Sequence, residues 1–200
     1  MTDQGTTWRE RQWQLRDEAI VDAAQRLLDK HGYSTMSMDE LAAEVGISKA
    51  TLYQHVSSKE EVAARAIVNS VRQMNDFIAA LDGSLSALER LKAAINFFVE
   101  RRYKDGAPAP ATSKSLHTIL LDHAEFQRQH TTLMTRLEQL VVQAQSEGSL
   151  IADLPSALLV RVMLSCTRDS EYEALISAGR CTSEELRHTL MTFIFHGVSV

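Results

Sequence analysis

Apolar residues recur at spacings of three and four positions along most of the chain, which is typical of helices that bury one side. The first such stripe includes Ile20, Ala23, Ala24 and Leu28. It ends at Gly32, because glycine adopts the left-handed conformation of a helix cap at little cost. No segment shows the alternating pattern of a half-buried strand. The sequence therefore predicts an all-α fold.

Several hydroxyl residues mark the starts of further helices. Ser37, Ser58 and Thr182 each stand three positions before a glutamate, which is the spacing of a capping box. Ser48 is a further N-cap candidate. Residues 1–13 are mainly polar, and we expect them to form a flexible arm. The helices expected in the first half run from near Trp13 to Gly32, over 38–45, over 48–55 and over 58–81.

Helical stripes continue through the second half of the chain. Residues 104–113 hold two of the three prolines, so we expect a loop there. Residues 157–164 are apolar nearly all round, so their helix must be covered on more than one side. The remaining expected helices cover 85–103, 114–123, 125–147, a segment starting near Pro155, and 184–198.

Two short helices joined by Gly46–Ser48 match the spacing of a helix-turn-helix, whose second helix enters the major groove of DNA. At about 100° per residue, Leu52 and Val56 fall on one side of this second helix. Ala50 and Gln54 lie at the centre of the opposite side. On spacing alone, an ordinary corner of a helical bundle remains an equal alternative.

The outward side of this second helix carries side chains that suit DNA. Ala50 is small enough to touch a thymine methyl group, and the Gln54 amide can pair with adenine. Donors at the edges can reach phosphates or bases, and the start of the preceding helix offers free backbone N–H groups. The candidate DNA-binding residues are Ser37, Ser48, Lys49, Ala50, Thr51, Tyr53, Gln54, His55 and Lys59.

Composition narrows the possible classes of protein. The chain has 200 residues, two cysteines and a net charge of −5, so any phosphate-binding surface must be local. Few cysteines and no signal-like N-terminus favour the cytoplasm. No apolar segment is long enough to cross a membrane.

Motifs of catalysis are absent from the sequence. It contains no glycine-rich phosphate loop, nucleophile elbow or paired His/Glu helix motif, so we expect neither an enzyme nor a bound cofactor. His117, His123 and His130 are six and seven residues apart, which does not place all three on one helix face. A metal site is therefore not expected.

The segment from Gly32 to Val62, GYSTMSMDELAAEVGISKATLYQHVSSKEEV, resembles the DNA-binding signature of the tetracycline-repressor (TetR) family of bacterial transcriptional regulators. The resemblance implies that one group of candidates contacts the DNA backbone and that the other group lies nearer the bases. Gln54 and Val56 depart from the family pattern, which often has aromatic residues there. The group implied in backbone contacts is Ser37, Ser48, Tyr53, His55 and Lys59, and the group nearer the bases is Lys49, Ala50, Thr51 and Gln54.

The resemblance implies two domains: a DNA-binding domain over 1–60, and a domain over 61–200 that binds an effector and dimerises, linked by the helix at 58–81. A homodimer would pair through the last two helices. Arg101, a charged residue on an otherwise apolar helix, is expected to face solvent unless it orients a polar ligand. The candidate ligand-binding residues are Phe98, Arg101, His117, Leu121, Phe126, Met134, Leu137, Met163, Cys166 and Tyr172.

The expected function is therefore that of a ligand-responsive transcriptional repressor in the bacterial cytoplasm, associated with the nucleoid, which binds its operator as a dimer and is released by a small-molecule effector. Its expected partners are double-stranded DNA with a palindromic operator, a small-molecule effector of unknown identity and a second copy of the chain, without a membrane. Repression is the usual outcome in the family. The alternatives are a non-enzymatic helical adaptor or interaction protein, and an activator of the same fold.

Overall fold

A computed structural model describes residues 7–103, 114–169 and 171–197 of the chain. Every regular element in these ranges is a helix, as the sequence predicts. The expected loop at 104–113 lies outside the described residues. The helices are α1 (Trp8–Thr35), α2 (Met38–Val45), α3 (Lys49–His55), α4 (Lys59–Ala80), α5 (Ala87–Tyr103), α6 (Lys114–Asp122), α7 (Ala124–Ser146), α8 (Ser156–Cys166), α9 (Glu171–Ser177) and α10 (Ser183–His196).

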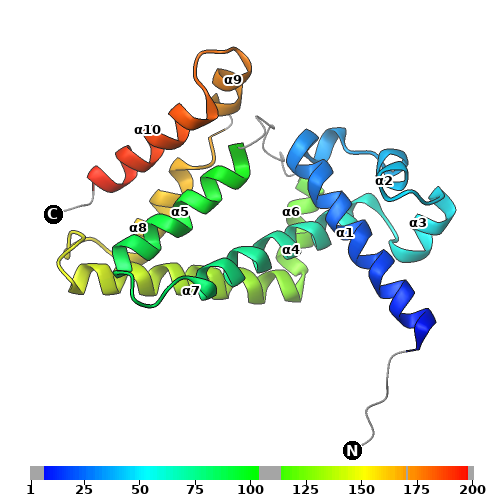
Figure 1. Ribbon diagram of the computed structural model, residues 1–200, viewed down its shortest axis with the longest axis horizontal. Coiled ribbons are helices and arrows are strands. Elements are labelled where there is room, and N and C mark those ends of the chain that lie inside the picture. Colours follow the sequence, from blue (N-terminus) through cyan, green and yellow to red (C-terminus); the bar gives the residue numbers. More distant parts are fainter. Residues whose placement is uncertain (1–6, 104–113, 170, 198–200) are drawn as a thin grey trace, which may run out of the picture.

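The molecule is elongated, with α1–α3 at one end and α8 and α10 at the other (Figure 1). Helices α4 and α7 pack together and run lengthwise between the two ends. Helix α4 also packs against α1 and α5, so it is in contact with both halves of the protein. No helix in the described ranges is both long enough and apolar enough to span a bilayer.

The first helix starts earlier than the sequence predicts. Thr7 and Glu10 form a complete capping box: the Glu10 backbone N–H donates to Thr7 Oγ1 and the Thr7 N–H donates to the Glu10 carboxylate. Helix α1 therefore begins at Trp8 rather than near Trp13, and residues 8–13 are helical instead of forming a flexible arm. Residues 1–6 of that expected arm lie outside the described residues.

The two short helices agree closely with their predicted ranges. Ser37 and Ser48 are the N-caps, and each hydroxyl accepts a hydrogen bond from the backbone N–H three residues later. Gly46 ends α2 in the left-handed conformation, with φ 75° and ψ 33°. A residue with a Cβ would be strained there, so Gly46 is what allows α2 and α3 to follow each other so tightly.

One hydrophobic cluster holds α1, α2 and α3 together and continues past residue 60. Ile20, Leu41 and Leu52 are fully buried in it, and the first half of α4 contributes Val62, Ala63, Ala64 and Ala66. Leu116 and Leu120 of α6 also belong to this cluster. The core of the N-terminal end therefore includes part of α4 and one face of α6.

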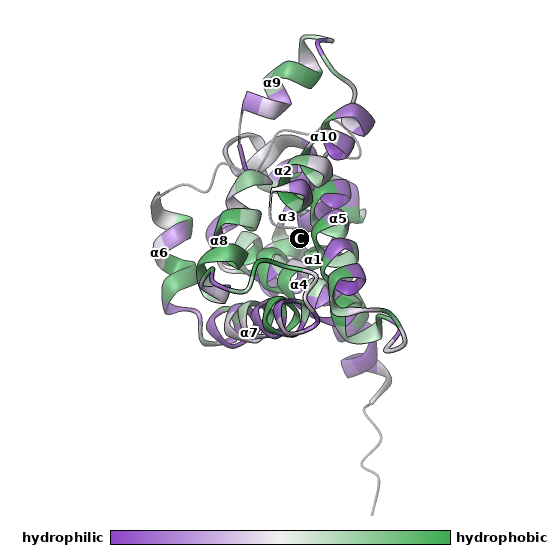
Figure 2. Ribbon diagram, turned by 90° about the vertical axis from the view of Figure 1, so that its left-hand side faces the viewer, coloured by the Kyte–Doolittle hydropathy of each residue, from purple (hydrophilic) through white to green (hydrophobic). Residues whose placement is uncertain are grey.

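A second cluster fills the other end of the molecule, with buried residues from α4, α5, α7, α8 and α10. Its fully buried members include Leu91 on α5 and Leu137 on α7. Figure 2 shows that α8 is predominantly hydrophobic. A small third cluster joins Tyr103 to Leu186 and Leu190.

Helix α9 was not predicted from the sequence. It has only seven residues, too few for a clear apolar stripe. Its local signal is Asp169, whose carboxylate accepts a hydrogen bond from the Glu171 backbone N–H at 2.9 Å. Tyr172 on α9 packs edge to face on Tyr103. This contact joins α9 to the end of α5.

Candidate nucleic-acid interface

Helix α3 presents one side to the core and the other to solvent, as predicted. Leu52 and Val56 are buried against α1 and α2, in the same cluster as Leu41. On the opposite side, Ala50 and Gln54 are exposed, and Tyr53 keeps 48% of its surface accessible. A short helix of small, amide and phenolic side chains therefore stands free of the core.

Lys49 is exposed but paired. Its Nζ lies 2.9 Å from a carboxylate oxygen of Asp39 in the first turn of α2. The hydrogen bond and the charge of this carboxylate raise the pKa of Lys49. Sequence reasoning missed Asp39, which places a negative charge beside the outward side of α3. Its signal in the sequence was its position in the first turn of the helix expected at 38–45, two residues after the Ser37 cap.

The hydroxyls of Ser37, Ser48 and Thr51 have structural partners. Ser37 Oγ accepts a hydrogen bond from the Glu40 N–H at 3.1 Å. Ser48 Oγ accepts one from the Thr51 N–H at 3.1 Å and lies 2.8 Å from Thr51 Oγ1. These side chains fix the starts of α2 and α3, so they position this surface whatever else they contact.

The predicted exposure of His55 is wrong. Its side chain is 0% exposed, because the indole of Trp13 stacks on the imidazole with ring centroids 3.7 Å apart. Nδ1 lies 3.4 Å from the Asp17 carboxylate. The sequence signal was the spacing of Trp13, which is seven residues before Ile20 and therefore on the buried side of α1.

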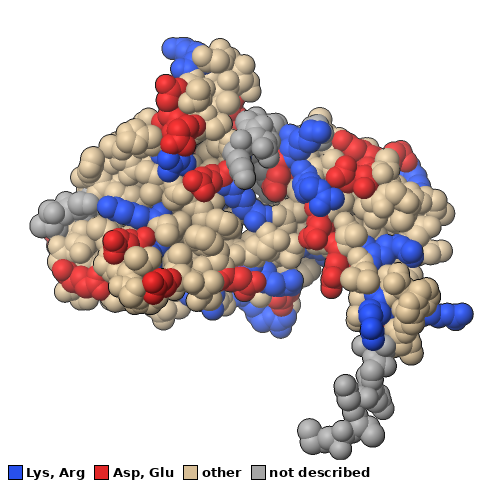
Figure 3. Space-filling view, viewed as in Figure 1, with Lys and Arg blue, Asp and Glu red and all other residues tan. Residues whose placement is uncertain are grey.

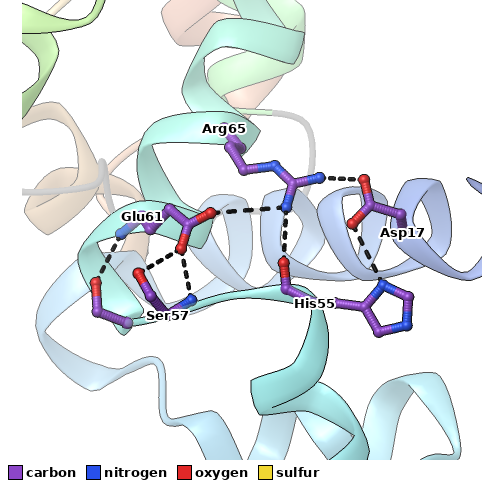
Figure 4. A network of polar contacts seen from close by, with 6 residues as sticks. Asp17, His55, Ser57, Glu61 and Arg65 are labelled. Carbon is purple, nitrogen blue, oxygen red and sulfur yellow. Dashed lines mark hydrogen bonds and ion pairs between the residues drawn. The ribbon is translucent and has the colours of Figure 1, made fainter.

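A polar network extends from His55 across three helices (Figure 4). The Arg65 guanidinium on α4 pairs with Asp17 on α1 and donates to the backbone carbonyl of His55 at 3.4 Å. Glu61 accepts hydrogen bonds from both the N–H and the hydroxyl of Ser57. The capping box expected at Ser58 is therefore altered, since the Glu61 carboxylate bonds Ser57 in addition to the usual Ser58 cap. This network fixes the end of α3 against α1 and α4.

Lys59 lies at the junction of α1 and α4. Its Nζ sits 4.5 Å from the centre of the Tyr33 ring and donates to the Ser34 carbonyl at 3.3 Å. The Tyr33 hydroxyl donates to the Glu60 carboxylate at 2.7 Å, which lowers the pKa of Glu60. The cation is half-buried and held in place at the start of α4.

The structure brings together six of the ten candidate ligand-binding residues. Tyr172 lies in the separate cluster with Tyr103, and His117 and Leu121 are exposed on α6. The six that line or contact the second hydrophobic cluster are Phe98, Phe126, Met134, Leu137, Met163 and Cys166.

The expectation that Arg101 faces solvent is wrong. Its side chain is only 19% exposed and lies 4.0 Å from the Asp29 carboxylate. Nη1 donates to Gln73 Oε1 at 2.6 Å. Burial lowers the pKa of Arg101, and the charge of Asp29 partly opposes this shift. Arg101 therefore links α5 to α1 and α4.

Two of the three histidines considered for a metal site have structural partners. His123 is the N-cap of α7, with Nδ1 accepting from the Phe126 N–H at 3.3 Å. His130 stacks on Phe126. In the described part of the chain, no group of three His, Cys, Asp or Glu side chains is arranged to hold a metal ion.

An apolar surface remains uncovered at the end of the molecule formed by α8 and α10. Phe193 is 70% exposed, and Leu158 and Val162 keep about half of their surface accessible. A depression of about 490 Å³ between the two helices is lined by Leu159, Val162, Met163, Cys166, Thr192, Phe193, Ile194, His196 and Gly197. The prediction that residues 157–164 need cover on more than one side is thus unmet within a single chain.

Comparison with known proteins relates the N-terminal end to one family. A family model described as bacterial regulatory proteins, tetR family, matches residues 20–66. An HTH-type transcriptional regulator of Mycobacterium tuberculosis is 36% identical over 62 residues, which is 31% of each chain. The chain thus spans about a third of the length of such relatives.

Two further relatives regulate in opposite senses. IcaR of Staphylococcus epidermidis, a negative transcriptional regulator of a biofilm operon, is 29% identical over 43% of this chain and 48% of its own. FasR of Mycolicibacterium smegmatis, a transcriptional activator, is 33% identical over 42% of this chain and 39% of its own. The relatives named here are transcriptional regulators and none is an enzyme.

Solved structures share the fold over nearly the whole chain. The fatty acid degradation regulator FadR of Bacillus halodurans has a TM-score of 0.70 and 16% identity, covering 91% of this chain and 95% of its own. AibR, solved with isovaleryl coenzyme A and operator DNA, has a TM-score of 0.60 and 24% identity, covering 90% of this chain and 98% of its own.

Proposed function

We propose, from the match of residues 20–66 to the tetR family of bacterial regulatory proteins, that the whole protein is a ligand-responsive transcriptional regulator. It acts in the bacterial cytoplasm and binds double-stranded DNA at a palindromic operator as a homodimer. The observation that carries this proposal is the outward side of α3, where Ala50, Tyr53 and Gln54 are exposed opposite the buried Leu52.

Helix α3 would enter the major groove with Ala50 and Gln54 toward the base edges. The position of Tyr53, half exposed at the border of this surface, favours a phosphate contact through its hydroxyl. Lys49 would exchange its present partner Asp39 for a phosphate. Such an exchange keeps the ammonium paired, so little desolvation opposes it.

Further contacts would come from around α3 rather than from its outward side. The Ser37 cap leaves backbone N–H groups at the start of α2 that suit a phosphate. Lys59 would add a cation near the same DNA strand. Thr51 and Ser48 would contribute hydroxyls, whereas His55 would contribute by holding the end of α3, because its ring is covered.

A homodimer would form through α8 and α10. The uncovered apolar surface with Phe193 and Val162 supports this arrangement, since exposed side chains of this kind on two adjacent helices suit a four-helix bundle with a second copy. A two-fold axis at that end would present two α3 helices to successive major grooves on one side of the DNA.

The effector would enter the second hydrophobic cluster, where Phe98, Phe126, Met134, Leu137, Met163 and Cys166 gather. AibR, which shares this fold, was solved in complex with isovaleryl coenzyme A and operator DNA, and this supports a small-molecule effector for the present chain. To regulate, the effector must bind the DNA-competent and incompetent arrangements unequally. Helix α4, with contacts to both halves, would carry the change to α3.

We favour repression, since a dimer that covers a promoter excludes polymerase. Activation stays the alternative, because the activator FasR matches 42% of this chain and the negative regulator IcaR matches 43%. A helical adaptor that does not bind DNA is disfavoured, because such a protein would not require Ala50, Tyr53 and Gln54 to be exposed on one side of α3.

A gel-shift titration with the DNA that flanks the protein's own gene tests the proposal. The wild type should shift this DNA, and Tyr53→Ala should weaken binding by more than tenfold with unchanged helix content by circular dichroism. Val142→Ala, on the exposed side of α7, is a control that should bind like the wild type. Intact binding by the Tyr53 variant would remove that residue from the interface, and no binding by the wild type at low salt would overturn the proposal.

A further inference from the structure

Helix α1 projects beyond the domain to which it belongs. Ile20 is its first fully buried residue, but the helix begins at Trp8. With a rise of about 1.5 Å per residue, the intervening twelve residues extend roughly 18 Å past the core. Figure 1 shows this end of α1 projecting past α3. We refer to residues 8–16 as the overhang.

The inward side of the overhang carries arginines where the rest of the helix carries apolar residues. Arg9, Trp13, Arg16 and Ile20 are separated by four, three and four positions, which places them within about 60° of one another around the helix. Beyond Ile20, the same stripe continues into the hydrophobic core as Ala23 and Leu27. The buried stripe of α1 therefore continues on the overhang as Arg–Trp–Arg.

These two arginines are available to an anion. Arg9 and Arg16 are exposed, and neither has a hydrogen-bond or ion-pair partner among the described residues. The acidic residue of the overhang, Glu10, is already engaged in the capping box with Thr7. In Figure 3, lysine and arginine side chains gather around this end of α1.

Trp13 fixes the direction in which the arginines face. Its ring lies on His55, the last residue of α3, which directly follows the exposed Gln54. The carboxylate of Asp17, one turn further along α1, is neutralised by Arg65. The cationic side of the overhang is thus held next to the edge of α3, and the Asp17 carboxylate between them is already paired.

We propose that the overhang is a second DNA-binding element, in which Arg9 and Arg16 contact backbone phosphates flanking the bases read by α3. The proposal rests on the proposed function, because it requires α3 to be in the groove. The occupant is DNA, since the duplex engaged by α3 would bring closely spaced phosphates to that edge. Trp13 is the positioning residue, because it sets the distance between the two elements.

The test combines the double variant Arg9→Ala/Arg16→Ala with the salt dependence of binding and a hydroxyl-radical footprint. Each lost phosphate contact should reduce the slope of log K against log salt by about 0.9. Four arginines in a dimer would thus reduce it by up to about 3.6. Protection should disappear at the outer edges of the footprint and persist at the centre of each half-site.

Two control variants separate this effect from a general loss of charge. Arg180→Ala removes an exposed cation next to α9, far from α3, and should leave slope and footprint unchanged. Arg9→Lys/Arg16→Lys keeps the charge and should retain most of the slope. Circular dichroism establishes that each variant is folded.

An unchanged slope and an unchanged footprint in the alanine variant would overturn the inference. So would a uniform loss of protection that includes the half-site centres, because this would mean that the arginines act by holding α3. If instead the wild type ignores duplex DNA altogether, the proposed function fails, and the two failures are distinguishable.

Discussion

The indole of Trp13 stacks on the imidazole of His55 with ring centroids 3.7 Å apart and planes 21° from parallel. This contact joins the overhang of α1 to the last residue of α3, two segments separated by the whole of α2. The Asp17–Arg65 pair, drawn in Figure 4, joins α1 to α4 beside this contact. The orientation of α3 therefore depends on a residue outside the segment that resembles the family signature.

Trp13→Ala should destabilise the domain and weaken DNA binding together. Loss of the stacked pair and its buried area should lower the free energy of unfolding by about 1–3 kcal/mol, measured by urea titration. Trp8→Ala is the matched control, because Trp8 is 74% exposed and its loss should change stability by less than about 0.5 kcal/mol. Equal effects of the two substitutions would show that the stacking has no structural role.

Asp39→Asn should strengthen DNA binding. The substitution removes the carboxylate that holds Lys49 and takes a negative charge away from the DNA-facing side. Affinity should rise several-fold, with a steeper salt dependence, in a fluorescence-anisotropy titration. Glu44→Gln, which removes a carboxylate paired with Arg26 at the end of α2, is the comparison and should have less effect. Weaker binding by the Asp39 variant would indicate that its pair with Lys49 is needed to position the lysine.

Phe193→Asp should convert the proposed dimer into a monomer. A carboxylate at the centre of an apolar interface loses its water without gaining a partner, which costs several kcal/mol. Light scattering coupled to size-exclusion chromatography measures the result. Val142→Asp changes an equally apolar exposed site on α7 and should leave the dimer intact. A wild-type protein that is monomeric at all concentrations would contradict the arrangement through α8 and α10.

Tyr33→Phe should reduce stability at neutral pH but not in acid. The Tyr33 hydroxyl bonds the Glu60 carboxylate and is the main cause of the lowered pKa of Glu60. A group whose folded pKa is lowered stabilises above its unfolded pKa of about 4.3, and this stabilisation is lost as pH falls through the folded value.

The partly solvated bond should contribute about 1 kcal/mol at pH 7. Urea unfolding at pH 7 and near pH 3 should therefore give a difference between wild type and variant only at the higher pH. A difference of the same size at both pH values would mean that the hydroxyl acts through packing rather than through the carboxylate.

The sequence predicted the boundaries of α2, α3 and α4 closely, because their signals are local. Ser48 caps the helix that starts at the next residue, and Gly46 ends α2 by its own conformation. Burial of Leu52 and exposure of Gln54 follow from helical periodicity alone. Such features need only a few neighbouring residues to be read.

The features that were missed depend on partners far along the chain. His55 is covered by a residue 42 positions earlier, and Arg101 bonds Gln73, 28 positions away. Periodicity states which side of a helix is buried but not what lies against its ends. The capping box formed by Thr7 and Glu10 is a local signal that the sequence prediction did not use. It starts α1 at Trp8, and only a helix that begins this early places the Trp13 ring on His55.

The most direct test is selection of random DNA duplexes by the purified full-length protein at low salt, followed by sequencing. A regulator that reads DNA as a two-fold dimer should enrich inverted repeats whose half-sites lie about one or more helical turns apart, roughly 10 base pairs or a multiple. The same selection with the Tyr53→Ala variant should lose that enrichment. Retention of no duplex by the wild type, or retention without any shared sequence, would contradict sequence-specific DNA binding by α3.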